Sequence, residues 1–156
     1  MSETRIIPAG TPEQIKRVRK LFREYAEATG AYECFEGFGK EIAGLPGPYR
    51  PPTGQLLLAE LDGRSAGCAA LRKLDDGISE MKRLYVRPAF RGRNLGHQLA
   101  KDIITEARRI GYRAMRLDTL SSMVAARALY QSFGFRAIGR YNDNPGAGVI
   151  YLELKL

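Results

Sequence analysis

The chain has 156 residues, within the usual range of one domain, and its 44% hydrophobic and 27% charged content is that of an ordinary globular protein. This composition excludes a disordered, fibrous or disulfide-dense class. Twenty-five Lys and Arg against seventeen Asp and Glu give a net charge of +8, which attracts polyanions without identifying one. We expect a single domain over residues 1–156.

The N-terminal residues, the apolar runs and the few cysteines and histidines bear on cellular location and metal binding. The first residues contain no cationic segment followed by an apolar core, and no run approaches the roughly 18 to 20 apolar residues of a membrane span. A cytoplasmic protein without a membrane partner is therefore expected. Cys34 and Cys68 form no CxxC pair and His97 is the only histidine, so we expect free thiols and no metal site.

The first expected element is an amphipathic helix that begins after Thr11 and ends at Gly30. Thr11 provides an N-cap, Pro12 suits the first turn, and Gln14 completes a capping box. Apolar residues then recur at helical spacing, at Ile15, Val18, Leu21, Phe22 and Tyr25. The proline- and glycine-rich stretch over residues 37–54 is expected to be a loop.

An antiparallel meander is expected next. Three apolar runs cover residues 55–61, 65–71 and 78–86. The turn sequences Asp62-Gly63 and Asp75-Asp76-Gly77 separate them, and such turns are typical of hairpins.

A long helix and a second set of strands complete the chain. The helix begins near Asn94 and closes at Gly111, and its apolar face holds Leu95, Leu99, Ile103, Ala107 and Ile110. A strand over residues 113–120 and a short helix capped by Ser121 or Ser122 follow it. That helix runs to Phe133, and strands over 135–141 and 149–156 end the chain.

This order predicts a mixed α/β fold in which helices cover a largely antiparallel sheet. The strand before the long helix should run parallel to the strand after it, because a helical crossover joins the two. We expect a ligand to bind at this crossover.

A basic turn leads into the long helix. The residues from 82 to 93 include five cations and no acid, namely Lys82, Arg83, Arg87, Arg91 and Arg93. In RGRNLG, residues 91–96, the glycines would let main-chain N–H groups approach an anion at the helix N-terminus. Taken alone, the segment is either a phosphate site or a simple solvated turn.

Two segments carry a family resemblance. Residues 84–100, LYVRPAFRGRNLGHQLA, resemble the acetyl-CoA signature of the GNAT superfamily of N-acetyltransferases, and residues 128–141, ALYQSFGFRAIGRY, resemble its second signature of Leu-Tyr followed by Gly-Phe. The resemblance extends over residues 55–156. It implies a GNAT-like fold with a mostly antiparallel twisted sheet of about six or seven strands, helices on both faces and one parallel strand–helix–strand crossover at the cofactor site.

The sequence departs from the family pattern at two positions. Asn94 stands where the family usually has the first glycine of its final pair, and asparagine tolerates the left-handed backbone region better than other non-glycine residues. Met123 stands seven residues before the tyrosine, where many members have an asparagine that contacts the cofactor. We expect Met123 to pack the helix instead.

The resemblance implies acetyl-CoA as the cosubstrate and no metal. The main chain of Leu84, Tyr85 and Val86 would pair with the pantetheine amides as an added strand does. The pyrophosphate would be held by N–H groups of the turn, which comprises Arg91, Gly92, Arg93, Asn94, Leu95 and Gly96.

The resemblance also suggests catalytic groups. Tyr130 matches the general acid that protonates the departing thiolate, although its helical spacing equally suits core packing. Glu80 has the offset of a general base in some members and shares strand parity with Lys82, Leu84 and Val86; its alternative is a salt bridge with Lys82, Arg83 or Arg72. A β-bulge at Val86 would free an N–H for the acetyl carbonyl.

The acceptor stays open between a small-molecule and a peptide amine, and a homodimer is possible for the family. Loop residues that could flank an acceptor pocket are Tyr49, Arg50, Tyr141, Asn142 and Asn144. His97 suits a surface position, and Cys68 suits the core. The alternatives to direct transfer in a ternary complex are a non-catalytic acyl-CoA-binding protein and a basic nucleic-acid-binding domain, although no nucleic-acid partner is expected.

Overall fold

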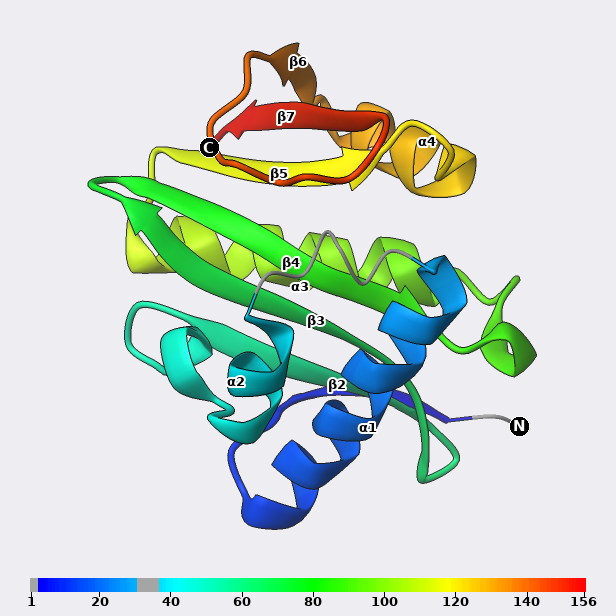
Figure 1. The fold of residues 1–156 in the computed structure, drawn as a ribbon. Coiled ribbons are helices and arrows are strands. Elements are labelled where there is room, and N and C mark those ends of the chain that lie inside the picture. Colours follow the sequence, from blue (N-terminus) through cyan, green and yellow to red (C-terminus); the bar gives the residue numbers. More distant parts are fainter. Residues whose placement is uncertain (1–2, 31–36) are drawn as a thin grey trace.

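A single seven-stranded sheet organises the molecule in this computed structural model, which describes residues 3–30 and 37–156 (Figure 1). Its strand order is β1-β2-β3-β4-β5-β7-β6. The strands are β1 (Thr4–Pro8), β2 (Gln55–Leu61), β3 (Arg64–Asp75), β4 (Ile78–Val86), β5 (Ala114–Leu120), β6 (Arg136–Ile138) and β7 (Val149–Lys155). All neighbours are antiparallel except β4 and β5, which confirms the predicted mixed sheet and its one parallel pair.

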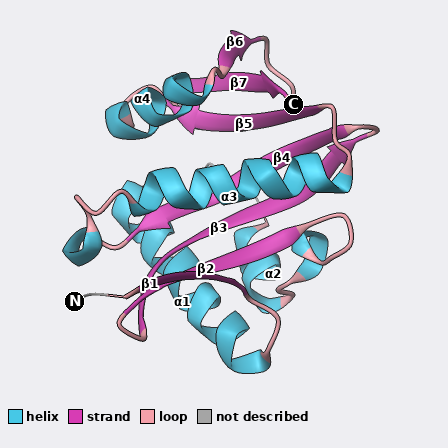
Figure 2. Cartoon of the chain, turned by 180° about the vertical axis from the view of Figure 1, so that it is seen from behind, coloured by secondary structure: helices cyan, strands magenta, loops and turns pink. Residues whose placement is uncertain are grey.

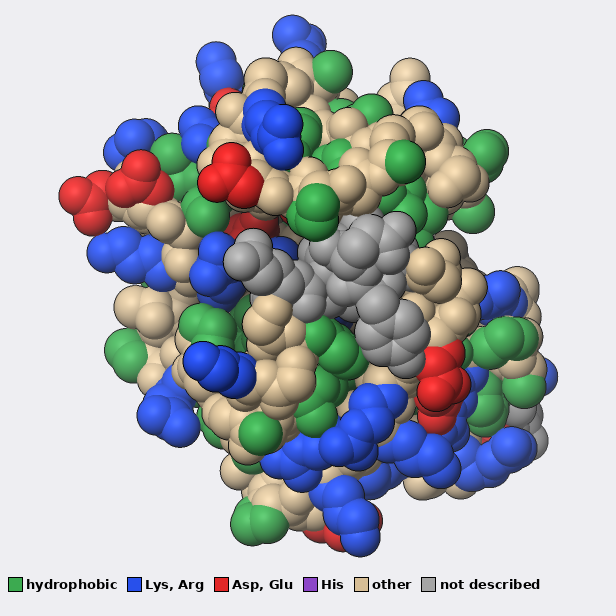
Figure 3. All heavy atoms as spheres, in the orientation of Figure 1, with side chains coloured by type: hydrophobic (Ala, Val, Ile, Leu, Met, Phe, Trp, Pro, Cys, Tyr) green, Lys and Arg blue, Asp and Glu red, His purple; other side chains and the backbone are tan. Residues whose placement is uncertain are grey.

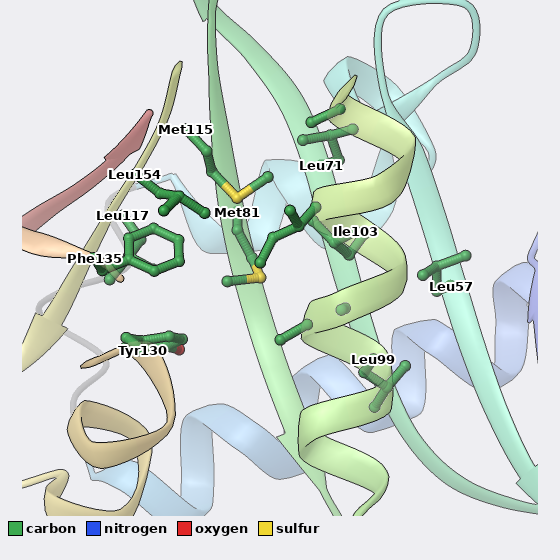
Figure 4. Close-up of a cluster of buried hydrophobic side chains, with 14 of the residues drawn as sticks. Leu57, Leu71, Met81, Leu99, Ile103, Met115, Leu117, Tyr130, Phe135 and Leu154 are labelled. Carbon is green, nitrogen blue, oxygen red and sulfur yellow. The ribbon is translucent and has the colours of Figure 1, made fainter. Parts of the chain in front are cut away.

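Helices cover both faces of the sheet (Figures 1 and 2). The helices are α1 (Pro12–Thr29), α2 (Phe38–Ala43), α3 (Leu95–Ile110) and α4 (Val124–Phe133). Helices α1 and α2 pack on one face over a core that includes Phe22, Leu58 and Tyr85. Helix α3 packs on the other face, where side chains of β4, β5, β7 and α4 converge around Met81 (Figure 4).

Local sequence signals account for the helix ends that were predicted well. The Thr11 hydroxyl accepts a hydrogen bond from the Gln14 N–H at 3.2 Å, and the Gln14 side chain accepts one from the Thr11 N–H at 3.0 Å. This capping box confirms the expected start of α1. Gly30 and Gly111 adopt the left-handed conformation and end α1 and α3 where the sequence indicated.

Several boundaries differ from the prediction. Strand β1 was not expected, and the stretch over residues 37–54 contains α2 and a 3-10 turn at Gly47–Tyr49 rather than a plain loop. Strand β6 ends at Ile138 instead of residue 141. The side chain of Arg140 donates to the carbonyls of Asn142 and Asn144, and these bonds hold the following residues as a loop. The N-cap of α4 is Met123 rather than Ser121 or Ser122, and no side chain caps it. Cys34 lies outside the described residues.

A β-bulge changes the direction of side chains along β4. Cys68 pairs with Tyr85 and Ala70 pairs with Lys82, so three steps on β4 oppose two steps on β3. The extra residue lies at Arg83, whose φ is +58°. One extra residue reverses the alternation of a strand between the two faces of its sheet.

Strands β4 and β5 pair over three residues only. The pairs run from Ile78 with Ala114 to Glu80 with Arg116, and beyond them the two strands diverge (Figure 1). Among the strands of residues 3–30 and 37–156, residues 81–86 of β4 therefore pair with β3 on one edge and with none on the other. In the described part of the chain, no helix combines the length and the apolar content needed to cross a bilayer.

Gly67 is expected to be intolerant of a side chain. A Cβ there would lie 2.5 Å from the Tyr85 carbonyl oxygen, so Gly67→Ala must displace β4 and should cost about 1–3 kcal/mol of unfolding free energy. The matched control is Gly10→Ala, because a Cβ at Gly10 meets nothing within 4 Å and should change stability by less than about 1 kcal/mol. Urea unfolding of both variants measures the difference, and equal midpoints would contradict the close approach.

Candidate active site

A groove of about 540 Å³ opens where β4 and α4 face each other across the divergence. Its walls come from the free edge of β4, the first turns of α4 and the end of α1. The groove is lined by Tyr25, Ala28, Thr29, Leu84, Tyr85, Val86, Arg91, Leu120, Ser122, Met123, Val124, Ala125, Ala126 and Leu129. Most of these side chains are apolar, so the groove suits a long, largely apolar ligand segment that can hydrogen bond to a strand edge.

The glycine turn lies at the end of this groove where α3 begins. Gly92 and Asn94 both have positive φ, 81° and 64°, which brings the chain round into the helix. No side chain caps α3, and its first helical bond runs from the Gln98 N–H to the Asn94 carbonyl. The amides of Leu95 to His97 thus precede the helical ladder, in the position where helix N-termini bind anions.

The predicted cofactor residues divide into two sets. Leu84, Tyr85, Val86 and Arg91 line the groove, whereas Gly92, Arg93 and Asn94 are exposed on the turn beside it. The Leu95 side chain is buried, and only its main chain can reach a ligand. A Cβ on Gly96 would lie 3.8 Å from Leu129 and 3.9 Å from Val86, in ordinary van der Waals contact, so the first turn of α3 lies beside both groove walls.

The basic run of residues 82–93 does not act as one patch. Arg83 forms two hydrogen bonds with Glu41 of α2, both at 2.9 Å, and Arg87 forms two with Glu24 of α1, at 2.8 and 2.7 Å. These two cations therefore hold helices onto the sheet. Exposed Lys and Arg side chains gather instead over α1, in the lower part of the face shown in Figure 3.

A small passage of about 40 Å³ adjoins the groove between β4 and β5. It shares Leu84 and Met123 with the groove, and it shares Lys82 and Asp118 with a polar pocket of about 330 Å³ on its far side. Groove, passage and polar pocket thus adjoin one another in this order and share wall residues. Two ligands that enter from opposite ends would meet in the passage.

Tyr130 lies at this meeting point. It projects from α4 into the core beside Phe135, with its hydroxyl toward β4 (Figure 4), and it lines the passage while remaining only 7% exposed. Burial, followed by the charges of Tyr25 and Asp118, raises the pKa of Tyr130 above its ordinary value. The neutral phenol is therefore favoured, and its hydroxyl can donate a hydrogen bond.

Glu80 lies in a buried network beside the polar pocket. The Arg72 Nε donates to its Oε1 at 2.8 Å, and the Tyr141 hydroxyl donates to its Oε2 at 2.6 Å. Lys82 Nζ lies 3.9 Å from Oε1, and Glu80 is 1% exposed. The predicted alternative of a salt bridge is thus present with Arg72, but it is buried rather than on the sheet surface. Burial and the Glu80 charge raise the pKa of Tyr141.

The bulge corrects two predictions about β4. Leu84 and Val86 pack against the α3 core, whereas Glu80 and Lys82 face the opposite side, so the four residues do not share a face. Val86 pairs in register with Gly67, and the bulge lies at Arg83 instead. Sequence could not reveal this position, because a bulge carries no residue signature here.

The polar pocket includes a carboxylate that the sequence did not single out. Asp118 of β5 accepts hydrogen bonds at Oδ2 from the side-chain amides of Asn142 at 2.8 Å and Asn144 at 3.2 Å. Burial acts to raise the pKa of Asp118, but Lys82 and the two amides outweigh it and hold the pKa below its usual value. The signal available in the sequence was an acidic residue within the apolar strand that follows the crossover helix.

The remaining predicted residues have mixed placements. Asn142, Asn144 and the buried Tyr49 line the polar pocket, whereas Arg50 is exposed. His97 stacks on Phe133 with ring centroids 4.7 Å apart. Met123 Sδ accepts a hydrogen bond from the Thr119 hydroxyl at 3.4 Å.

Cys68 is buried and donates from its thiol to the Arg83 carbonyl at 3.4 Å. Across residues 3–30 and 37–156, no group of three or more His, Cys, Asp or Glu is arranged to hold a metal.

Comparisons with known proteins agree with this geometry. The model of the acetyltransferase (GNAT) family matches residues 15–135. An uncharacterised N-acetyltransferase from Schizosaccharomyces pombe is 38% identical over 93% of this chain and 90% of its own length. A GNAT-family acetyltransferase from Staphylococcus aureus superposes with a TM-score of 0.80 at 18% identity, covering 98% of this chain and 99% of its own. A Salmonella typhimurium protein solved with its cofactor acetyl-CoA has a TM-score of 0.70 at 20% identity, covering 97% and 93% of the two chains.

The burial of Glu80 should determine its contribution to stability. Glu80→Gln removes the charge that compensates Arg72 in a buried site, and a loss of about 3 kcal/mol of unfolding free energy is expected. Glu153→Gln is the matched control, because Glu153 also faces an arginine across a strand pair at 2.8 Å but is 22% exposed. That change should cost less than about 1 kcal/mol in the same denaturation experiment. Similar costs for both variants would show that burial of the Glu80 network contributes little.

Proposed function

The chain belongs to the acetyltransferase (GNAT) family and is therefore an acyltransferase enzyme, and we propose that it transfers the acetyl group of acetyl-CoA to a primary amine of a small molecule or peptide. The observation that carries the proposal is the row of adjoining cavities, from groove through passage to polar pocket, which share wall residues. Such a row lets both substrates bind together, so the amine can attack directly in a ternary complex.

The groove fits the elongated shape and mixed chemistry of acetyl-CoA. The free edge of β4 at Leu84, Tyr85 and Val86 offers main-chain groups to the pantetheine amides, in the manner of an added strand. The turn from Arg91 to Gly96 offers helix-terminal amides and two arginines to the pyrophosphate. When bound, the cosubstrate supplies an activated thioester, and the residues of this chain position it.

Tyr130 is proposed as the general acid. As the amine nitrogen forms its bond to the acetyl carbon, the carbon–sulfur bond breaks, and the Tyr130 hydroxyl gives its proton to the departing sulfur. The nitrogen releases one proton to water, and the phenolate recovers a proton from the same solvent. The location of Tyr130 in the passage supports this assignment, because a general acid must lie within hydrogen-bond reach of the departing sulfur.

The other two catalytic assignments have weaker support. Glu80 remains a proposed base, but both of its oxygens accept hydrogen bonds from Arg72 and Tyr141, so a water would have to carry the proton to it. For the acetyl carbonyl we propose a main-chain donor on β4 near the bulge, because a bulge interrupts the ladder that otherwise occupies strand amides.

Binding of acetyl-CoA is the first test. Titration calorimetry should give micromolar affinity for acetyl-CoA and no comparable affinity for NAD or ATP, because only the pantetheine arm can pair with the β4 edge. Absence of binding at millimolar acetyl-CoA would refute the cosubstrate. Tight binding without transfer to any amine would favour a non-catalytic acyl-CoA-binding protein.

Replacement of the Tyr130 hydroxyl should slow chemistry selectively. Tyr130→Phe is expected to lower kcat by about 10²–10⁴-fold, as loss of a positioned general acid does, and to leave acetyl-CoA affinity within about threefold. Tyr112→Phe is the control, since Tyr112 donates its hydroxyl proton to the Thr53 carbonyl away from the three cavities. Thiol release with a turned-over amine measures kcat, and near-normal turnover of Tyr130→Phe would refute the role.

A further inference from the structure

Two opposite charges face each other across the junction of the passage and the polar pocket. Lys82 and Asp118 line both cavities. They form no ion pair within 4.0 Å, although Lys82 is close enough to lower the pKa of Asp118. A space bounded by one cation and one anion therefore lies beside Tyr130, where the acceptor nitrogen must arrive.

The side of this space that Asp118 forms is anionic. Asp118 Oδ2 accepts both asparagine amides, while Oδ1 accepts no hydrogen bond from any residue that the structure describes. Every fully buried side-chain nitrogen and oxygen of the described residues has a partner, so Oδ1 cannot be fully buried. An ionised oxygen that opens to a cavity suits an ammonium group, because hydrogen bonds between two charged groups are the strong ones.

The side of this space that Lys82 and Arg72 form carries the cations. Lys82 and Arg72 share the single carboxylate of Glu80, and its Oε2 is already bonded to Tyr141. Arg72 uses Nε for this bond, and its two terminal nitrogens have no hydrogen-bond partner among residues 3–30 and 37–156. By contrast, Arg83 is matched by Glu41 in a two-bond pair. Within this group of three side chains, one positive charge has no carboxylate of its own; the exposed Asp143 lines the polar pocket without an ion pair to Lys82 or Arg72.

We propose that the acceptor is a small zwitterion, a primary amine that also carries a carboxylate, with its ammonium group against Asp118 and its carboxylate against Lys82 and Arg72. This inference rests on the proposed acetyl transfer and names the substrate class of the same site. The pocket volume of about 330 Å³ lies near the lower end of small-molecule sites, which favours a free amino acid over a polypeptide. The bound ammonium loses one proton to water before its nitrogen attacks.

The test compares acids with their amides. A free amino acid and the matching amide differ in the negative charge of the carboxylate, so each pair isolates the effect of that charge. The panel of pairs varies the side chain and the distance from amine to carboxylate. Thiol release is measured at saturating acetyl-CoA, and calorimetry with coenzyme A present measures binding. At least one acid should exceed its amide by about 10- to 100-fold in kcat/KM.

Two variants assign the charges. Lys82→Met should lower kcat/KM of the acid by about 10- to 100-fold and that of the amide much less, which removes the preference. Asp118→Asn keeps an oxygen for the two asparagine amides and should raise KM of acid and amide alike by about tenfold or more. Lys101→Met, an exposed position on α3, is the matched control and should keep the wild-type preference.

Each outcome separates this inference from the function on which it rests. Absence of acetyl-CoA binding refutes the proposed function itself. If acetyl-CoA binds but amides or polyamines are acetylated as well as acids, the zwitterion proposal is wrong and the transferase remains. A preference that survives in Lys82→Met, or no binding of any acid in the presence of coenzyme A, also overturns the proposal.

Discussion

The short pairing of β4 with β5 is the constraint on which the site depends. Only three residue pairs join these parallel strands, so the main chain of β4 beyond Glu80 has one edge without a strand neighbour. Strand amides and carbonyls need partners, and an edge of this kind accepts an extended ligand. The divergence also leaves room for Tyr130 from α4 and Asp118 from β5 to face the same passage. One departure from regular pairing thus creates both the binding edge and the reaction space.

The bulge at Arg83 lies on β4 just beyond the residues that pair with β5, and surrounding contacts hold it. A positive φ at a residue other than glycine costs about 1–3 kcal/mol and persists where surrounding contacts fix it. Here Glu41 binds the Arg83 guanidinium at two points, the Cys68 thiol donates to the Arg83 carbonyl, and the Phe38 ring lies 5.7 Å below the guanidinium carbon. These contacts come from α2 and β3, so elements distant from the cofactor side determine how β4 presents its edge.

Sequence predicted the fold better than it predicted the site. Caps, glycine ends and apolar periodicity are local, and they located α1, α3 and the meander correctly. The bulge, the pairing of Arg83 and Arg87 with helices, and the role of Asn142 and Asn144 around Asp118 all join residues that lie far apart in the chain. Such contacts leave no periodic pattern. The glycine turn was recognisable because its chemistry lies within six consecutive residues.

The small volume of the passage also bears on the length of the acyl chain. Its volume of about 40 Å³ is far smaller than the 540 Å³ of the groove and the 330 Å³ of the polar pocket. Met81, Met123 and Tyr130 bound it, and Met81 and Tyr130 are held in the core around α3. An acyl chain longer than acetyl would therefore have to extend from the passage into the adjoining polar pocket, into the space that the acceptor would occupy.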